Sequence, residues 1–124
     1  MLSYPDLDSA SNQLNVRGRK VLPNGGSRSS IQSAPYTIFL DSCQGKHIID
    51  VDGNKYIDFN NNYTSLIHGH CHPKIVEAAT KQIAKGSAFA FGSEIEVKLA
   101  ELLCDRVPAF EQVRFMNSGT EAVM

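Results

Sequence analysis

Hydrophobic and polar residues alternate in three short runs in the first half of the chain. The runs are Y-T-I-F-L-D (36–41), H-I-I-D-V (47–51) and K-Y-I-D-F (55–59). Their apolar members include Ile49, Val51, Ile57 and Phe59, which alternate with His47, Asp50, Tyr56 and Asp58. Asp52-Gly53 favours a tight turn between the second and third runs. The pattern therefore predicts a small antiparallel meander in which each strand has one apolar face.

The spacing becomes helical after His72-Pro73. Apolar residues recur there at Ile75, Val76, Ala79 and Ile83, and Lys85-Gly86 is a typical helix end. A second helix is predicted from Ser93, which forms a capping box with Glu96, and Pro108 ends it. Its buried stripe is expected to consist of Ile95, Leu99, Leu102 and Leu103.

The last part of the chain predicts a strand, a glycine turn and the start of another helix. Q-V-R-F-M (112–116) has the composition of a strand, and N-S-G-T-E-A follows it. Together they predict the beginning of an α/β unit, whose parallel sheet needs partner strands and covering helices. The sequence contains no candidates for those partners, so we expect the chain to be a fragment.

The first 34 residues predict little regular structure. Pro5, Pro23 and the run N-G-G-S-R-S-S favour turns. At most one short helix is expected, around residues 9–21. On its own composition, P-N-G-G-S-R-S-S (23–30) favours a flexible linker, and it is not a P-loop because no Gly-Lys-Ser/Thr follows.

Composition and charge favour small-molecule chemistry in a soluble, cytoplasmic protein. The 124 residues are 42% hydrophobic and 20% charged, with a net charge of -1, so no basic surface for nucleic acid is expected. No apolar stretch approaches the roughly 18 residues that span a membrane. Cys43, Cys71 and Cys104 are far apart and predict reduced thiols rather than a disulfide framework.

Ser118 permits two interpretations. It can simply cap the last helix, with Glu121 completing a second capping box, and local sequence alone favours that view. The same geometry exposes the amides of Gly119 and Thr120 beside two hydroxyls, which suits a dianionic phosphate. Capping and phosphate binding do not exclude each other.

Three separated segments favour the phosphate site. D-V-D-G-N-K-Y-I-D-F, G-H-C-H-P and R-F-M-N-S-G-T-E-A occur in this order. They resemble the N-terminal part of class III, pyridoxal-phosphate-dependent aminotransferases of fold type I. The similar branch holds glutamate-1-semialdehyde aminomutase and the β-amino-acid transaminases, and the resemblance runs from about Val21 to Met124.

The resemblance implies an α/β fold. It comprises a segment with a small antiparallel β-meander and helices, then the first strand-turn-helix of the large domain. Residues 1–34 would form an N-terminal arm and loop, and residues 35–66 the meander of the small N-terminal domain. Residues 67–124 would be the truncated start of the domain that binds pyridoxal 5'-phosphate (PLP).

The resemblance also implies an enzyme that moves an amino group through a Schiff base with PLP. Ser118, Gly119 and Thr120 would hold the cofactor phosphate. The partners would be small amino donors and acceptors, with no nucleic acid or membrane, and the full-length enzyme would be a homodimer. The family's Schiff-base lysine lies beyond the sequence. No catalytic residue is therefore assigned, and the fragment itself is expected to be inactive.

Two substrate-binding residues are implied by the same resemblance. The run around Arg28 is similar to G-G-N-S-R-S of β-amino-acid transaminases, where the arginine meets the substrate carboxylate. Tyr63 in N-Y-T-S matches a pocket-lining position, although a buried structural tyrosine would fit as well. The aminomutase pattern differs at both places, which favours a transaminase without excluding an aminomutase.

The run H-G-H-C-H (68–72) supports an alternative function. His68, His70, Cys71 and His72 could form a metal or anion site in a small non-catalytic module. The spacing fits no standard zinc pattern, and Gly69 interrupts it. We therefore predict no metal and interpret the run as a turn before a helix.

Overall fold

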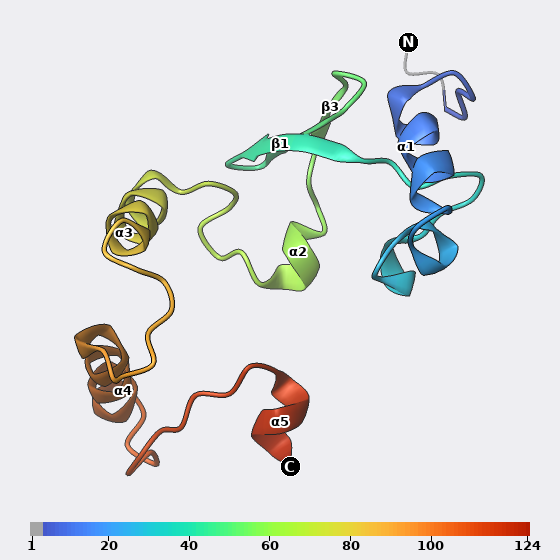
Figure 1. Ribbon diagram of the computed structural model, residues 1–124. Helices are drawn as coiled ribbons and strands as arrows, with labels where there is room; N and C mark the ends of the chain where they lie inside the picture. The colour runs from blue at the N-terminus through green and yellow to red at the C-terminus, as the bar shows by residue number, and fades with distance from the viewer. Residues whose placement is uncertain (1–3) are drawn as a thin grey trace. The chain divides into compact units, whose positions relative to one another are not determined.

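The computed structural model describes residues 4–124 and divides into two compact units, Met1–Thr80 and Lys81–Met124. The first unit begins with the helix α1 (Ala10–Gly18) and the single turns η1 (Pro23–Gly25) and η2 (Ser29–Ile31). The strands β1 (Leu40–Gln44), β2 (His47–Asp50) and β3 (Lys55–Ile57) follow, and then the short turn α2 (Asn61–Thr64) (Figure 1). The helix α3 (Pro73–Ile83) crosses the boundary between the units. The second unit also contains α4 (Glu94–Arg106) and α5 (Gly119–Val123).

The three strands form the predicted antiparallel meander, in the order β1-β2-β3. The first strand begins later than predicted, at Leu40 rather than at residue 36. The reason is the register: Gln44 faces His47, so Gly45 and Lys46 make the turn and residues 40–44 pair with β2. The apolar run before Leu40 supplies core packing instead, because the Tyr36 side chain within it is only 2% exposed.

Tyr36 joins the chain's beginning to the sheet. The ring centroids of Tyr4 and Tyr36 lie 5.0 Å apart, and the Tyr4 hydroxyl donates to the Tyr36 carbonyl at 2.8 Å. The Tyr36 hydroxyl accepts from the Asp6 amide, also at 2.8 Å. Both hydroxyls are therefore hydrogen-bonded, and the Tyr36 ring is withdrawn from water while Tyr4 remains partly exposed.

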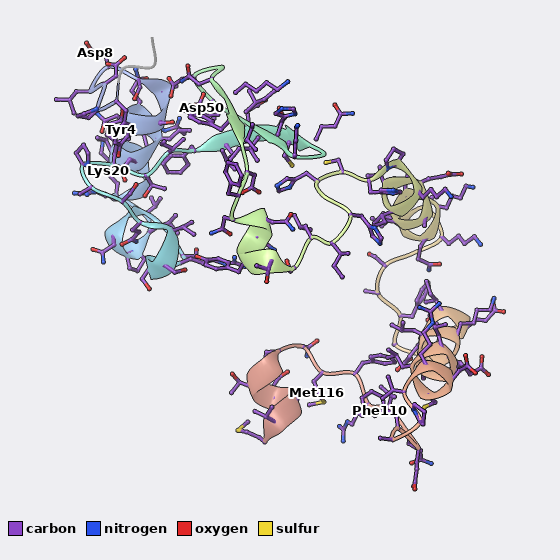
Figure 2. The ribbon with its side chains drawn as sticks, turned by 180° about the vertical axis from the view of Figure 1, so that it is seen from behind. Tyr4, Asp8, Lys20, Asp50, Phe110 and Met116 are labelled. Carbon is purple, nitrogen blue, oxygen red and sulfur yellow. The ribbon has the colours of Figure 1, made fainter. Side chains whose placement is uncertain are left out.

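The predicted alternation of faces is wrong at Asp50, which is 3% exposed (Figure 2). Its carboxylate accepts from the Asn54 amide at 2.7 Å and from the Tyr56 hydroxyl at 2.7 Å. Burial alone would raise the pKa of Asp50, but these bonds, with others from Asn54 and Asp52, outweigh it and lower that pKa. Asp50 thus anchors the hairpin turn from inside. Phe59, predicted to lie on the apolar face, is 92% exposed.

The carboxylate of Asp52 caps α1. Ala10 and Ser11 donate their backbone amides to it at 2.6 and 3.1 Å, and the Ser9 hydroxyl accepts from the Asn12 amide at 3.2 Å. These acceptors satisfy amides that have no partner within the helix. The predicted helix is therefore present, although it is shorter than residues 9–21.

In the second unit, α4 begins at the predicted place but without the predicted capping box. The Ser93 side chain makes no capping bond, and its carbonyl accepts from the Glu96 amide at 3.2 Å instead. The expected stripe of α4 is not buried either: Ile95 is 52% and Leu99 46% exposed. No helix in residues 4–124 is long and apolar enough to cross a membrane.

Residues 112–116 do not form the predicted strand. Figure 2 labels Phe110 and Met116 near the two ends of this segment between α4 and α5. A strand requires a neighbouring strand to bond its amides and carbonyls. Within residues 4–124 no strand pairs with this segment, so its β-propensity is not realised.

Candidate functional site

Tyr63 lies on a left-handed helical turn. The φ angles of Asn61, Asn62, Tyr63 and Thr64 are +53°, +50°, +56° and +67°. Asparagine tolerates this region, but a tyrosine and a β-branched threonine there cost roughly 1–2 kcal/mol each. Such strain persists only where surrounding bonds impose it, and it is concentrated at functional sites.

Polar side chains impose the turn from both ends. One oxygen of Asp58 accepts from the amides of Asn60 and Asn61 at 2.9 and 3.0 Å. The Asn60 side chain accepts from the Tyr63 amide at 2.7 Å, and the Asn61 side chain donates to the Leu66 carbonyl at 2.9 Å. The direction of the Tyr63 side chain therefore follows from a network that starts at Asp58.

The Tyr63 hydroxyl reaches the loop that contains Arg28. It donates to Oγ of Ser30 at 3.0 Å, across 33 positions of sequence. Arg28 is the residue that precedes η2, and Ser30 is the middle residue of that turn. Two segments implied separately by resemblance are thus brought together. The sequence does not predict this contact of Ser30, because nothing in its spacing indicates a partner in α2.

The loop around Arg28 is a folded part of the chain, with defined turns at η1 and η2. The Gly25 carbonyl packs against α1 so closely that a Cβ at Gly18 would lie 2.8 Å from its oxygen. Gln32 donates its side-chain amide to the Asn24 carbonyl at 3.2 Å. The composition-based expectation of a flexible linker is therefore wrong. Arg28 itself is exposed to solvent.

The histidine run is a turn before a helix, as predicted. His70 Nε2 donates to Asp58 Oδ2 at 2.6 Å, and this bond is the main cause that lowers the pKa of Asp58. His72 precedes α3, its ring lies 5.4 Å from that of His68, and its Nδ1 is buried without a hydrogen-bond partner. Among residues 4–124 no three His, Cys, Asp or Glu side chains are grouped to hold a metal ion. The geometry therefore gives the metal form of the alternative function no support.

Ser118 caps α5 through its side chain. Its hydroxyl oxygen accepts from the Glu121 amide at 3.2 Å, and Glu121 Oε2 accepts from the Asn117 amide at 3.0 Å. The amide that donates to Glu121 is that of Asn117, one residue before the N-cap amide that donates in a standard capping box. Space beside Gly119 is open, because a Cβ there would meet no atom within 4 Å. The O–H of Ser118 and the amides of Gly119 and Thr120 remain available to an anion, whereas the Glu121 amide is used by the cap.

Comparison with known proteins relates this chain to one family. The sequence model for aminotransferase class-III matches residues 29–124. Glutamate-1-semialdehyde 2,1-aminomutase of Acetivibrio thermocellus is 42% identical over 120 residues, which cover 94% of this chain and 28% of that protein. The chain thus spans little more than a quarter of this relative's length.

Solved structures give the same result. An omega-transaminase from Sphaerobacter thermophilus is 52% identical, with a TM-score of 0.91 over 97% of this chain and 27% of that one. A β-phenylalanine aminotransferase from Variovorax paradoxus is 35% identical, with a TM-score of 0.86 over 92% and 26%. The expected fold class, that of the PLP-dependent transaminases of fold type I, is confirmed.

Proposed function

Because this chain belongs to the class-III aminotransferase family, we propose that it supplies binding elements of a PLP-dependent transaminase for carboxylate-bearing amino compounds. The observation that carries the proposal is the bond between Tyr63 and Ser30. This bond joins the segment of Arg28 to the turn of α2. The guanidinium of Arg28 and the phenol of Tyr63 therefore belong to the same folded unit. A carboxylate is the ligand that a guanidinium binds through two parallel hydrogen bonds.

The family's cofactor is PLP, which when bound supplies an electron sink for moving an amino group. The donor set at the start of α5 fits a phosphate dianion. Ser118 and Thr120 carry hydroxyl donors, Gly119 leaves room for close approach, and the amides of Gly119 and Thr120 begin the helix, where amides have no partner within the helix. We assign the phosphate to these three residues. The Glu121 carboxylate is occupied by the Asn117 amide.

Arg28 and Tyr63 are assigned to the substrate. Arg28 binds the carboxylate and so orients the amino group, while the Tyr63 ring forms a wall of the pocket. Ser30 fixes the direction of the Tyr63 hydroxyl and is a positioning residue. Small amino donors and acceptors are the proposed partners, and the active assembly is proposed to be a homodimer.

An aminomutase acting within one substrate molecule is the second candidate. The 42% identity to an aminomutase supports it. The run G-G-S-R-S-S around Arg28, which resembles the β-amino-acid transaminases, favours the transaminase. The two candidate activities differ in one requirement. A transaminase needs an added keto acid as acceptor, whereas an aminomutase does not.

A hybrid enzyme tests the proposal. Residues 1–124 would replace the matching segment of the Sphaerobacter omega-transaminase, with the unaltered enzyme as control. PLP retention after dialysis and amino transfer from β-amino acids to a keto acid would be measured. We expect both, and we expect Ser118→Ala with Thr120→Val to weaken PLP retention. A folded hybrid that retains PLP but transfers no amino group from any acid would contradict the substrate assignment.

A further inference from the structure

Two cysteines that the proposed function does not use lie side by side in the first unit. The sulfur atoms of Cys43 and Cys71 are 3.9 Å apart, although the residues are 28 positions apart in sequence. Cys43 is in β1, and Cys71 lies two residues before the first residue of α3, Pro73. Both thiols are free. A disulfide requires about 2.05 Å between sulfurs, so modest side-chain rotations would bring them to bonding distance.

The backbone holds the two segments in place. Gly45 donates its amide to the His70 carbonyl at 2.8 Å, and His70 donates back to the Gly45 carbonyl at 2.9 Å. Gly69 allows this approach: its φ is +72°, and a Cβ there would lie 2.8 Å from the Gly45 oxygen. The His70 to Asp58 bond adds a third tie to the same loop. The proximity of the sulfurs therefore has a structural cause beyond chance contact of side chains.

The two thiols differ in exposure, and the raised pKa of Cys43 disfavours it as the first nucleophile. Cys71 is exposed, whereas Cys43 is half-buried. Burial, followed by the contact with Cys71, raises the pKa of Cys43. A cavity of about 260 Å³ opens beside the pair and is lined also by His47 and Lys55. Both thiols, the exposed one and the half-buried one, thus line a small cavity whose lining also includes the cation of Lys55.

We propose that Cys43 and Cys71 form a dithiol modification site for small anionic disulfides such as oxidised glutathione. The Cys71 thiolate attacks one sulfur of the reagent, forming a mixed disulfide and releasing one reduced thiol. The Cys43 thiolate then attacks Cys71 Sγ and releases the second thiol. The protein dithiol loses two electrons and two protons, the reagent gains them, and one intramolecular disulfide forms.

The disulfide would close a loop that contains the whole of β2, β3 and α2. Tyr63 and its supporting residue Asp58 lie within that loop. Modification would therefore fasten the segment of Tyr63 to β1 through a covalent bond. The proposal does not depend on the transaminase assignment, because both sulfurs belong to the first unit.

The test uses the 124-residue chain and oxidised glutathione in native buffer. Reduced chain would be exposed to the reagent, quenched with acid, alkylated and digested, and the peptides identified by mass spectrometry. We expect a mass loss of about 2 Da, a linked pair of peptides with Cys43 and Cys71, and alkylated Cys104. Formation should be on the order of tenfold faster than in denaturant, because folding raises the effective concentration of one thiol at the other.

Two variants serve as controls. Cys104→Ser removes a thiol that belongs to the second unit and should leave the linked pair unchanged. Cys43→Ser removes the resolving thiol, so a stable glutathione adduct should accumulate at Cys71. The proposal is overturned if the unaltered chain accumulates stable adducts at Cys71 without closing the bond. It is equally overturned if disulfides to Cys104 form as readily as the expected pair.

Discussion

The Tyr63 hydroxyl donates to Ser30 Oγ at 3.0 Å and so ties the left-handed turn of α2 to the loop that follows Arg28. Both hydroxyls could bond a substrate, but in this structure they are bonded to each other. Their separate contributions to catalysis should therefore be coupled.

Ser30→Ala and Tyr63→Phe in the hybrid enzyme each remove this one hydrogen bond. Each should lower kcat/KM by roughly 2- to 10-fold, which corresponds to about 0.5–1.5 kcal/mol. The double variant should lose little more than the worse single one, because the bond is already absent. Steady-state kinetics of the four proteins measure this coupling, with Ser42→Ala as an exposed control. Fully additive losses would show that the two side chains act independently.

Arg28→Ala in the hybrid enzyme should lower kcat/KM selectively for substrates that carry a carboxylate. Loss of a charge-assisted pair to a carboxylate costs about 1.5–3 kcal/mol, or roughly 10- to 100-fold in kcat/KM. Amines without a carboxylate should react almost as before, and PLP retention should not change. Arg17→Ala, an exposed arginine on α1, is the matched control. Equal losses for acids and amines would instead give Arg28 a structural role.

The isolated 124-residue chain should not catalyse transamination beyond the rate of free PLP. We expect none of its lysines to act as the family's Schiff-base lysine, and without that lysine no base would move the proton. The measurement is keto-acid formation from a β-amino acid with PLP, with and without the chain. A rate above that of free PLP would contradict the expectation.

Tyr56 should make the stability of the first unit fall at high pH. Burial, then the hydrogen bond to Asp50, raises the pKa of Tyr56 from 10.0 to about 12. The folded state therefore holds this proton more tightly than the unfolded state. Its contribution is complete below about pH 10 and is lost as the pH rises toward 12. Urea unfolding of the chain, followed by circular dichroism, should show this decline, and Tyr56→Phe should reduce it.

Gly18→Ala should destabilise the packing of η1 on α1. Its Cβ would lie 2.8 Å from the Gly25 oxygen, which is backbone and cannot rotate away. Overpacking of this kind costs about 1–3 kcal/mol. Gly26→Ala is the matched control, because no atom lies within 4 Å of its Cβ and its backbone is extended. A lower urea midpoint for Gly18→Ala alone would confirm the close contact, whereas equal midpoints would contradict it.

Local chemistry made much of this fold predictable. The turn at Asp52-Gly53, the helix start at Pro73 and the Ser118 cap depend on neighbouring residues, and the structure contains all three. The stripe of α4 and the segment 112–116 carry apolar patterns whose partners are not among the described residues. A pattern can specify which face should be buried, but burial requires something to cover it.

The remaining differences arise from side-chain contacts that form only once the chain has turned. In the sequence Asp50 resembles a surface residue. Its hydrogen-bond donors Asn54 and Tyr56 come within reach of its carboxylate only once the hairpin has turned. The left-handed turn contradicts the propensities of Tyr63 and Thr64 and is imposed by Asp58 and Asn60. Ser30 acquires its partner only through that turn. Sequence spacing carries none of this information.

The cap that Asp52 places on α1 has a consequence for the order of events during synthesis. Ala10 leaves the ribosome 42 residues before Asp52, which at about 5–20 residues per second is roughly 2–8 s. A nine-residue helix is marginal in water without tertiary support. We therefore expect the nascent N-terminal segment to remain mostly unstructured until the hairpin emerges and Asp52 can accept hydrogen bonds from the first amides of α1. We expect the hairpin of β2 and β3 to fold before α1, although α1 is synthesised first.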